Sequence, residues 1–266
     1  MQRKTIFIVL ILLVITVGLL WHVKWGDRLL KSELAQSFQA DVAQGDVGQD
    51  LGQDKNQSSD QNQNINLDLN LNPNPVTVTF LDIGQGDATF IEWPDGTQML
   101  VDCGKDARVL EALGRVMKFY DKEIDYVVPT HPDADHYGGC IDVLKRFKVN
   151  NVVWTGYTVP DKQWQYFLQM AAEEEANVIQ LKEKTVWQIA STTLAFLYPD
   201  HDLSVDATFP GFDKIADNNA SIVMKLSYGD SDILLTGDAE SPLEQYLISA
   251  YGEALDVDVL HVGHHG

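Results

Sequence analysis

Hydrophobic and polar residues alternate along residues 76–84, VTVTFLDIG, in the pattern of a half-buried strand. The stretches ATFIEWP and TQMLVDCG predict two further strands, joined by a hairpin turn at Pro94–Gly96. Residues 106–119 then place apolar side chains at helical spacing, which predicts an amphipathic helix. The short apolar run IDYVVPT predicts a buried strand after that helix.

The remainder of the chain alternates strands and helices in the same way. Two hairpins and several strand–helix pairs predict mixed sheets, and two sheets packed face to face with outer helices fit this order. The expected elements are a helix over 140–147, strand VNNVVWT, a helix near 161–176, strands near 178–181, 185–189 and 193–198, a polar loop over 199–218, the hairpin strands ASIVMKLSY and DILLTGD, a helix over 242–250, and strand DVDVLHV leading to GHHG.

The amino-terminal residues have a different pattern. The uncharged run from Ile6 to Trp21 is close to the lower limit for a membrane-spanning helix, about 17 residues. Its flank WHVKWGD places bulky Trp21 and Trp25 where a cleavage site would have small residues, so residues 1–25 predict an uncleaved signal anchor. Arg3 and Lys4 place the amino terminus in the cytoplasm and the rest of the chain outside, in a single-pass arrangement at the cell membrane.

Residues 26–75 predict a juxtamembrane piece and a flexible linker. The stretch from residue 44 to 75 is rich in Gln, Asn and Asp and contains no aromatic residue. Such a composition buries too little apolar surface to offset the entropy lost on ordering. Residues 76–266 are therefore expected to form the folded domain.

Charge and cysteine content add two constraints. The chain has 19 basic and 39 acidic residues, a net charge of −20, which disfavours tight, salt-driven binding of nucleic acid by the protein surface alone. Metal ions could still supply the positive charge of a nuclease. Cys103 and Cys140 could form a disulfide in an exported domain, or both could be small buried side chains; their spacing does not decide between these.

Residues 130–139, THPDADHYGG, crowd four potential metal ligands into six positions: His131, Asp133, Asp135 and His136. Two further ligand groups also follow predicted strands, Asp238 after DILLTG and the pair His264–His265 after DVDVLHV. Ligands at several strand ends build a metal site on rigid elements. On a loop, His131 and Asp133 can serve one metal and Asp135 and His136 a second, with Asp238 bridging. Two metals about 3.5–4 Å apart can clamp the attacking and leaving oxygens of a displacement.

These motifs resemble a known family. HPDADHYGG is similar to the His-x-His-x-Asp-His signature of the metallo-β-lactamase fold, with Asp133 in place of the second histidine. More narrowly, the order of VTFLDIGQGDATFIEWPDGTQMLVDCG, THPDADHYGG, NNASIVMKLSYGDSDILLTGDAE and DVLHVGHHG resembles the extracellular hydrolase domain of the ComEC family of DNA-uptake proteins. It is equally similar to free-standing exported hydrolases of that type. The resemblance implies an α+β fold, a four-layer αββα sandwich with a dinuclear metal site on one edge.

The resemblance also assigns residues. It implies metal ligation by His131, Asp133, Asp135, His136 and Asp238, with His264 preferred over His265 from the last motif; Asp135, His136 and Asp238 are expected to be catalytic. Asn219 stands where related enzymes carry a third-motif histidine and would be a weak ligand or a substrate contact. Asp87, in GQGD, would lie beside the site and support it.

Two departures from the family pattern carry consequences. Asp133 and Asn219 replace nitrogen donors by oxygen donors, which shifts the preferred pair of divalent ions from Zn²⁺ toward Mn²⁺, with Zn²⁺ and Mg²⁺ also compatible. The family pattern continues beyond HHG with further strand and helix, so the domain is expected to be incomplete at its carboxyl end.

The function expected from these residues is an outward-facing, metal-dependent phosphodiesterase or nuclease acting on extracellular DNA, held at the membrane by the amino-terminal helix. No stable protein partner is predicted. A hydrolase of a small ester, lactone or thioester is the first alternative, because one fold hosts many substrates. A β-lactamase is least favoured, since the nitrogen-rich first metal site is absent. A non-catalytic or truncated metal-binding module is the second alternative.

Overall fold

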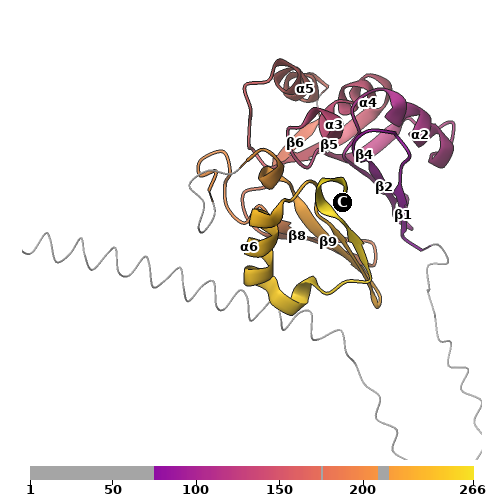
Figure 1. Ribbon diagram of the computed structural model, residues 1–266. Coiled ribbons are helices and arrows are strands. Elements are labelled where there is room, and N and C mark those ends of the chain that lie inside the picture. The colour runs from indigo at the N-terminus through magenta and orange to yellow at the C-terminus, as the bar shows by residue number, and fades with distance from the viewer. Residues whose placement is uncertain (1–74, 175, 209–215) are drawn as a thin grey trace, which may run out of the picture. The chain divides into compact units, whose positions relative to one another are not determined.

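The computed structural model describes residues 75–174, 176–208 and 216–266 (Figure 1). The predicted signal anchor over 1–25 and the linker up to residue 74 lie outside these residues. Within the described part, no helix combines the length and apolar character needed to cross a membrane. The division of the chain into anchor, linker and hydrolase domain therefore stays a prediction.

One sheet contains six strands in the order β1-β2-β3-β4-β5-β6. The strands are β1 (Thr77–Phe80), β2 (Thr89–Glu92), β3 (Gln98–Val101), β4 (Glu123–Val128), β5 (Lys148–Trp154) and β6 (Asn177–Gln180). The first three are antiparallel neighbours, whereas β3 to β6 run parallel. Parallel neighbours need crossover connections. These are supplied by α2 (Arg108–Val116), by α3 (Ala134–Tyr137) with α4 (Cys140–Arg146), and by α5 (Lys162–Glu173).

The second sheet contains five strands in the order β11-β10-β9-β8-β7. They are β7 (Thr185–Ile189), β8 (Thr192–Tyr198), β9 (Val223–Tyr228), β10 (Ser231–Leu235) and β11 (Val259–His261), and only the β10–β11 pair is parallel. Helix α6 (Ser241–Tyr251) and the short 3₁₀ helix η2 (Gly252–Leu255) connect β10 to β11. Two further 3₁₀ turns, η1 (Asn218–Ala220) and η3 (Gly263–His265), carry residues of the candidate site.

Alternate side chains of the first sheet enter two separate cores. Leu100 and Val127 point outward and pack with the helices α2, α4 and α5, while Met99 and Val128 point inward against the second sheet. Helix α6 lies beside β8 in Figure 1, and the Tyr251 hydroxyl donates to the Leu197 carbonyl at 2.5 Å. The observed layers are helix, sheet, sheet and helix, and the expected mixed sheets of an α+β fold are confirmed.

The segment THPDADHYGG differs from the loop expected from sequence, because part of it is the helical turn α3. His136 and Tyr137 donate their backbone amides to the Asp133 carbonyl, at 2.9 and 3.1 Å. Both side chains are buried, and a buried backbone amide that lacks water must find a partner within the protein. A helical turn supplies that partner locally, which an extended loop would not.

Cys103 and Cys140 form a disulfide, with their Cα atoms 5.2 Å apart. The bond joins the loop after β3 to the first residue of α4. The same two segments share backbone hydrogen bonds, from Cys103 N–H to the His136 carbonyl at 2.6 Å and from Gly139 N–H to the Gly104 carbonyl at 2.9 Å. A side chain on Gly139 would collide with the carbonyl oxygens of Cys103 and Asp106, so the close approach requires glycine there.

Candidate metal centre

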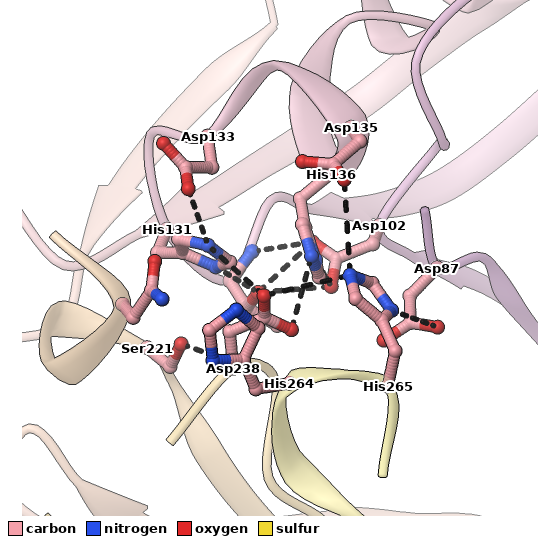
Figure 2. A network of polar contacts seen from close by, with 12 residues as sticks. Asp87, Asp102, His131, Asp133, Asp135, His136, Ser221, Asp238, His264 and His265 are labelled. Carbon is pink, nitrogen blue, oxygen red and sulfur yellow. Dashed lines mark hydrogen bonds and ion pairs between the residues drawn. The ribbon is translucent and has the colours of Figure 1, made fainter. Parts of the chain in front are cut away.

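The candidate site lies where loops follow the carboxyl ends of β3, β4 and β10 (Figure 2). Asp102 follows β3, His131 and α3 follow β4, and Asp238 follows β10. Residues of η3 approach from the end of β11. Sequence-distant side chains thereby meet at one edge of the two sheets, as expected for a site carried by strand ends.

Asp102 organises the innermost part of the site. Its buried carboxylate accepts hydrogen bonds from the Thr130 amide at 2.7 Å, from the Thr130 hydroxyl at 2.9 Å, and from Nδ1 of His136 at 2.9 Å. The Thr130 oxygen is also 3.0 Å from Nδ1 of His131. Because the Thr130 hydroxyl donates its hydrogen to Asp102, its oxygen accepts a hydrogen bond from Nδ1 of His131. The Nε2 atoms of His131 and His136 therefore remain available as metal ligands.

His131, Asp133 and Asp238 form one half of the site. Nε2 of His131 lies 3.8 Å from Oδ2 of Asp133 and 3.9 Å from Oδ2 of Asp238. These separations are too long for direct hydrogen bonds, and they leave room for a divalent ion that His131 and Asp133 would hold together with Asp238. The backbone amide of Asp238 donates to the Ser221 hydroxyl at 3.0 Å, which fixes the aspartate at the end of its strand.

Asp238 also belongs to the other half of the site. Its Oδ1 lies 3.0 Å from Nε2 of His136, and its Oδ2 lies 3.7 Å from Nε2 of His265. Nε2 of His265 is 3.7 Å from Oδ2 of Asp135, and Nδ1 of the same ring is 3.5 Å from Oδ1 of Asp87. Ligand atoms of Asp87, His136, Asp238 and His265 all lie within 4.8 Å of one another.

The charges of this cluster are strongly coupled in the metal-free protein. Burial opposes protonation of His136, but the carboxylates of Asp102 and Asp238 outweigh burial and raise its pKa to about 11. Burial would raise the pKa of Asp238, yet the neighbouring histidines, His136 foremost, hold it below the usual aspartate range. The pKa of Asp133 is lowered as well, chiefly by its contact with His131. The cluster therefore carries ionised carboxylates at neutral pH, as ligands for a cation must.

Unpaired buried atoms test whether these residues fit a metal. Nε2 of His131 and Oδ2 of Asp87 are buried without hydrogen-bond partners within the described part of the chain, whereas the buried Nε2 of His136 and Oδ1 of Asp238 face each other as an ion pair at 3.0 Å. Buried polar atoms are normally hydrogen-bonded, and groups of exceptions require an explanation. All four atoms belong to this cluster, and imidazole nitrogen and carboxylate oxygen are ordinary donors to divalent ions. The residues present therefore fit a metal centre.

The structure separates the two histidines of the last motif. His265 joins the cluster, whereas Nδ1 of His264 lies 3.5 Å from Oε1 of Glu240, and the His264 side chain is 53% exposed. The geometry thus favours His265 over His264, the reverse of the preference drawn from sequence. Both residues have positive φ, 54° and 63°, and this backbone turn decides which ring faces Asp238.

Asn219 lies outside the cluster. Its side-chain carbonyl accepts the Glu240 amide at 3.0 Å, and its amide nitrogen donates to the Glu240 carboxylate at 3.1 Å. Both ends of the amide are thus engaged. Asp87 was expected beside the site and instead supplies one of the four clustered ligand atoms.

Three supporting residues escaped the sequence analysis: Asp102, Thr130 and Ser221. Each follows or precedes a strand and looks like an ordinary turn residue in sequence. The one available signal for Asp102 was an acidic residue at the close of an apolar strand, in MLVDCG. That signal is weak, because the partners of Asp102 are 28 and 34 residues away.

Two hollows flank the centre. One of about 640 Å³ lies on the side of Asp87, Asp135 and His265, and its floor includes Gly84 and Gly86. The other, of about 320 Å³, lies on the side of Asp133 and also involves residues such as Asp161 and Asp217. No lysine or arginine lines either hollow among the described residues.

Comparison with known proteins agrees with this geometry. Residues 81–266 match the family model described as the metallo-beta-lactamase superfamily. ComE operon protein 3 of Bacillus subtilis is 32% identical over 206 residues, which cover 71% of this chain and 25% of that protein. Recombination protein 2 of Haemophilus influenzae is 27% identical over 193 residues, which cover 71% of this chain and 21% of that protein.

Competence protein ComA of Neisseria gonorrhoeae is 26% identical over 190 residues, which cover 71% of this chain and 23% of that protein. The chain thus spans about a quarter of the length of these relatives. Their names confirm the resemblance to ComEC-type proteins drawn from the sequence motifs. With a family model matched over most of its length and a ligand cluster at the motif residues, the chain belongs to the metallo-beta-lactamase superfamily.

Proposed function

We propose that this protein is a membrane-anchored phosphodiesterase that cleaves DNA outside the cytoplasm and uses two divalent ions, with Mn²⁺ preferred. The observation that carries the proposal is the central position of Asp238. Its two carboxylate oxygens face His131 on one side and His136 and His265 on the other. A carboxylate shared between two ligand groups is what a pair of ions requires.

The two ligand groups divide around Asp238. His131 and Asp133 would hold one ion, and Asp135, His136 and His265 would hold the second, with Asp87 next to His265. Four of these seven side chains donate oxygen, which favours Mn²⁺ or Mg²⁺ over Zn²⁺. Ions held there would polarise a phosphoryl oxygen and stabilise the negative charge that develops on it.

The protein's own residues position that chemistry. Asp102 holds the His136 ring directly and the His131 ring through Thr130. Gly86 lies so close to the Asp135 carbonyl that a side chain there would overlap it, so the GQGD loop packs directly against α3. These contacts restrict the ligands to one arrangement before any substrate arrives.

Relatives named for competence and recombination favour a nucleic-acid substrate. Two further observations support the location. The apolar run from Ile6 to Trp21, preceded by Arg3 and Lys4, favours a membrane anchor with the domain outside. The Cys103–Cys140 disulfide favours an oxidising compartment, because disulfides are rare in the cytosol.

The test is cleavage of single- and double-stranded DNA by the full chain with Mn²⁺, Mg²⁺ or Zn²⁺. Asp135→Ala should abolish cleavage, and Asp142→Ala is the matched control, since Asp142 lies on the next helix and pairs with Lys145. Manganese-dependent cleavage that only Asp135→Ala removes would support the proposal. Metal binding without cleavage of any DNA would exclude a nuclease.

A small ester or lactone is the second candidate substrate, and the lining of the two hollows favours it. Among the residues that the structure describes, no lysine or arginine of either hollow faces phosphates on either side of the scissile bond. A neutral substrate needs none. Turnover of p-nitrophenyl acetate or a homoserine lactone, without turnover of bis(p-nitrophenyl) phosphate, would select this candidate.

A further inference from the structure

The basic residues of the folded part are unevenly distributed. From Val76 onward the chain contains 13 basic and 31 acidic residues, a net charge of −18. Six of the 13 fall in two short stretches, namely Arg115, Lys118, Lys122, Lys145, Arg146 and Lys148. Around them stand five acidic residues, Glu111, Asp121, Glu123, Asp125 and Asp142, so this region has a net charge of +1 while the remainder carries −19.

The two stretches lie side by side in space. Lys148 donates its backbone amide to the Lys122 carbonyl at 2.8 Å, and its ammonium pairs with Glu123 at 2.7 Å. The ammonium of Lys122 lies over the ring of Phe147, 5.9 Å from its centroid. The cations therefore form one surface at the amino ends of β4 and β5, where α2 and α4 end.

Two aromatic side chains project from this surface. Phe119 is 88% exposed and Tyr120 is 66% exposed, and their rings meet edge to face with centroids 5.3 Å apart. Large apolar side chains exposed next to each other mark surfaces that contact another phase or partner. We call the six cations together with Phe119 and Tyr120 the basic aromatic edge.

Three of the six cations form ion pairs with carboxylates, and the other three do not among the described residues. Arg115, Lys145 and Lys148 pair with nearby acidic residues. Lys118, Lys122 and Arg146 have no ion-pair partner among the residues that the structure describes, and all three are exposed. These three are available to an anionic surface.

We propose that the basic aromatic edge lies against a membrane containing anionic phospholipid and holds the metal centre away from the bilayer. This inference rests on the membrane anchoring proposed above. Lysine and arginine beside exposed aromatic rings are the composition that binds headgroups and inserts into the interface. The metal centre is at the carboxyl end of β4, and a six-residue strand separates the two ends by about 20 Å. The basic aromatic edge lies at the opposite end of the sheet from the metal centre, so binding of this edge to the membrane would orient the domain with the metal centre facing away. The edge is too far from the metal centre to hold the nucleotides next to the scissile bond.

Hydrogen–deuterium exchange of the full chain in lipid nanodiscs tests the proposal. Discs of phosphatidylcholine alone are compared with discs that also contain phosphatidylglycerol, at low and at high salt. Amides of residues 117–122 should exchange more slowly only on the anionic discs at low salt. Each unpaired cation contributes about a fivefold gain in surface binding, so the protection should be large where it occurs.

Variants at exposed positions keep the fold and isolate the surface. Lys118→Gln with Lys122→Gln should weaken surface binding roughly 25-fold and thereby reduce or abolish the protection. Lys182→Gln with Lys184→Gln, exposed lysines outside the edge, is the matched control and should leave it unchanged. Phe119→Ser should also weaken the protection.

Val205→Ser is the matched control for Phe119→Ser, since Val205 is 84% exposed and lies elsewhere. Exchange that is equal on the two kinds of disc would overturn the proposal. Protection by a single-stranded oligonucleotide, without any from anionic lipid, would also overturn it and assign the edge to nucleic acid. Anchoring is measured separately, as retention on phosphatidylcholine discs after a high-salt wash, and DNA cleavage is measured on the same discs. Failure of anchoring or of cleavage is therefore distinguishable from failure of the basic aromatic edge to bind anionic lipid.

Discussion

Replacing Asp102 by Asn isolates the residue that holds both histidine ligands. Asp102 has a φ of 57°, in the left-handed region, where Asn is tolerated as well as Asp. The substitution therefore keeps the backbone, the volume and one acceptor oxygen. It removes the negative charge and places an NH₂ group opposite one of the two donors, the Thr130 hydroxyl or Nδ1 of His136.

The structure sets the size of the effect. The carboxylate accepts from three donor groups, and an amide oxygen in the place of Oδ1 can keep both bonds from Thr130 while the bond from His136 to Oδ2 is lost. A hydrogen bond to a charged group contributes about 1.5–3 kcal/mol. Loss of a group that orients a metal-binding histidine lowers metal affinity by about 10–100-fold, or about 1.4–2.7 kcal/mol. The two estimates agree, so Asp102→Asn should weaken Mn²⁺ binding by roughly that factor.

Titration calorimetry with Mn²⁺ measures the affinity, and urea denaturation in a chelator measures the stability of the metal-free protein. Asp125→Asn is the matched control, because Asp125 also accepts from a backbone amide, that of Gln98, and from a side chain, but away from the site. The control should leave metal affinity unchanged. Wild-type Mn²⁺ affinity in Asp102→Asn, or an equal loss in both variants, would refute the role given to Asp102.

Three further measurements test other features. Cys103→Ala with Cys140→Ala opens a disulfide whose cysteines are 37 positions apart and should lower the free energy of unfolding by about 4 kcal/mol; a denaturation midpoint equal to that of the oxidised wild type would contradict this. The pKa of His136 is raised from 6.5 to about 11 without metal, so the ring is protonated at pH 7. Protonation contributes its full stabilisation of the metal-free fold below pH 6.5, and this stabilisation is lost as the pH rises through 11. Metal binding at pH 7 should therefore release about one proton from this ring, seen as a calorimetric heat that varies with the ionisation enthalpy of the buffer, and a buffer-independent heat would argue against it. Gly139→Ala should destabilise the protein, since the added Cβ would meet backbone carbonyl oxygens. Gly114→Ala, which has open space around it in α2, should stabilise the protein by up to about 1 kcal/mol. Equal melting temperatures of the two variants would count against the close approach at Gly139.

Most of the fold follows from local patterns in the sequence. The alternation in VTVTFLDIG, the Pro94–Gly96 turn and the apolar run IDYVVPT each specify an element through neighbours a few residues away. The observed β1 and the β2–β3 hairpin lie within the predicted strands, and β4 begins one residue before IDYVVPT. The segment THPDADHYGG lacked such a pattern, and its helical turn depends on burial beneath other parts of the chain.

In the candidate site, too, the sequence indicates residues that belong to a local motif and misses residues whose role depends on distant parts of the chain. His131, Asp133, Asp135 and His136 could be proposed because they are adjacent in sequence. The order of preference between His264 and His265 stays a prediction, since the direction of each ring depends on two consecutive residues with positive φ, which no local pattern reveals. Asp102 was missed because its role exists only after β3 and β4 have paired, which brings Val101 beside Val128.

Burial within the site indicates how a substrate would reach it. His131, His136 and Asp238 are buried, and the inner network through Asp102 accounts for that. Asp133 and His265, by contrast, have 45% and 37% of their side chains exposed, on opposite sides of Asp238. A substrate group can therefore approach along the line between these two exposed ligands, with one flanking hollow at each end. A chain that extends in both directions from the reacting bond suits that arrangement better than a compact molecule, which is a geometric reason, independent of any relative's name, to test a polymer such as DNA first.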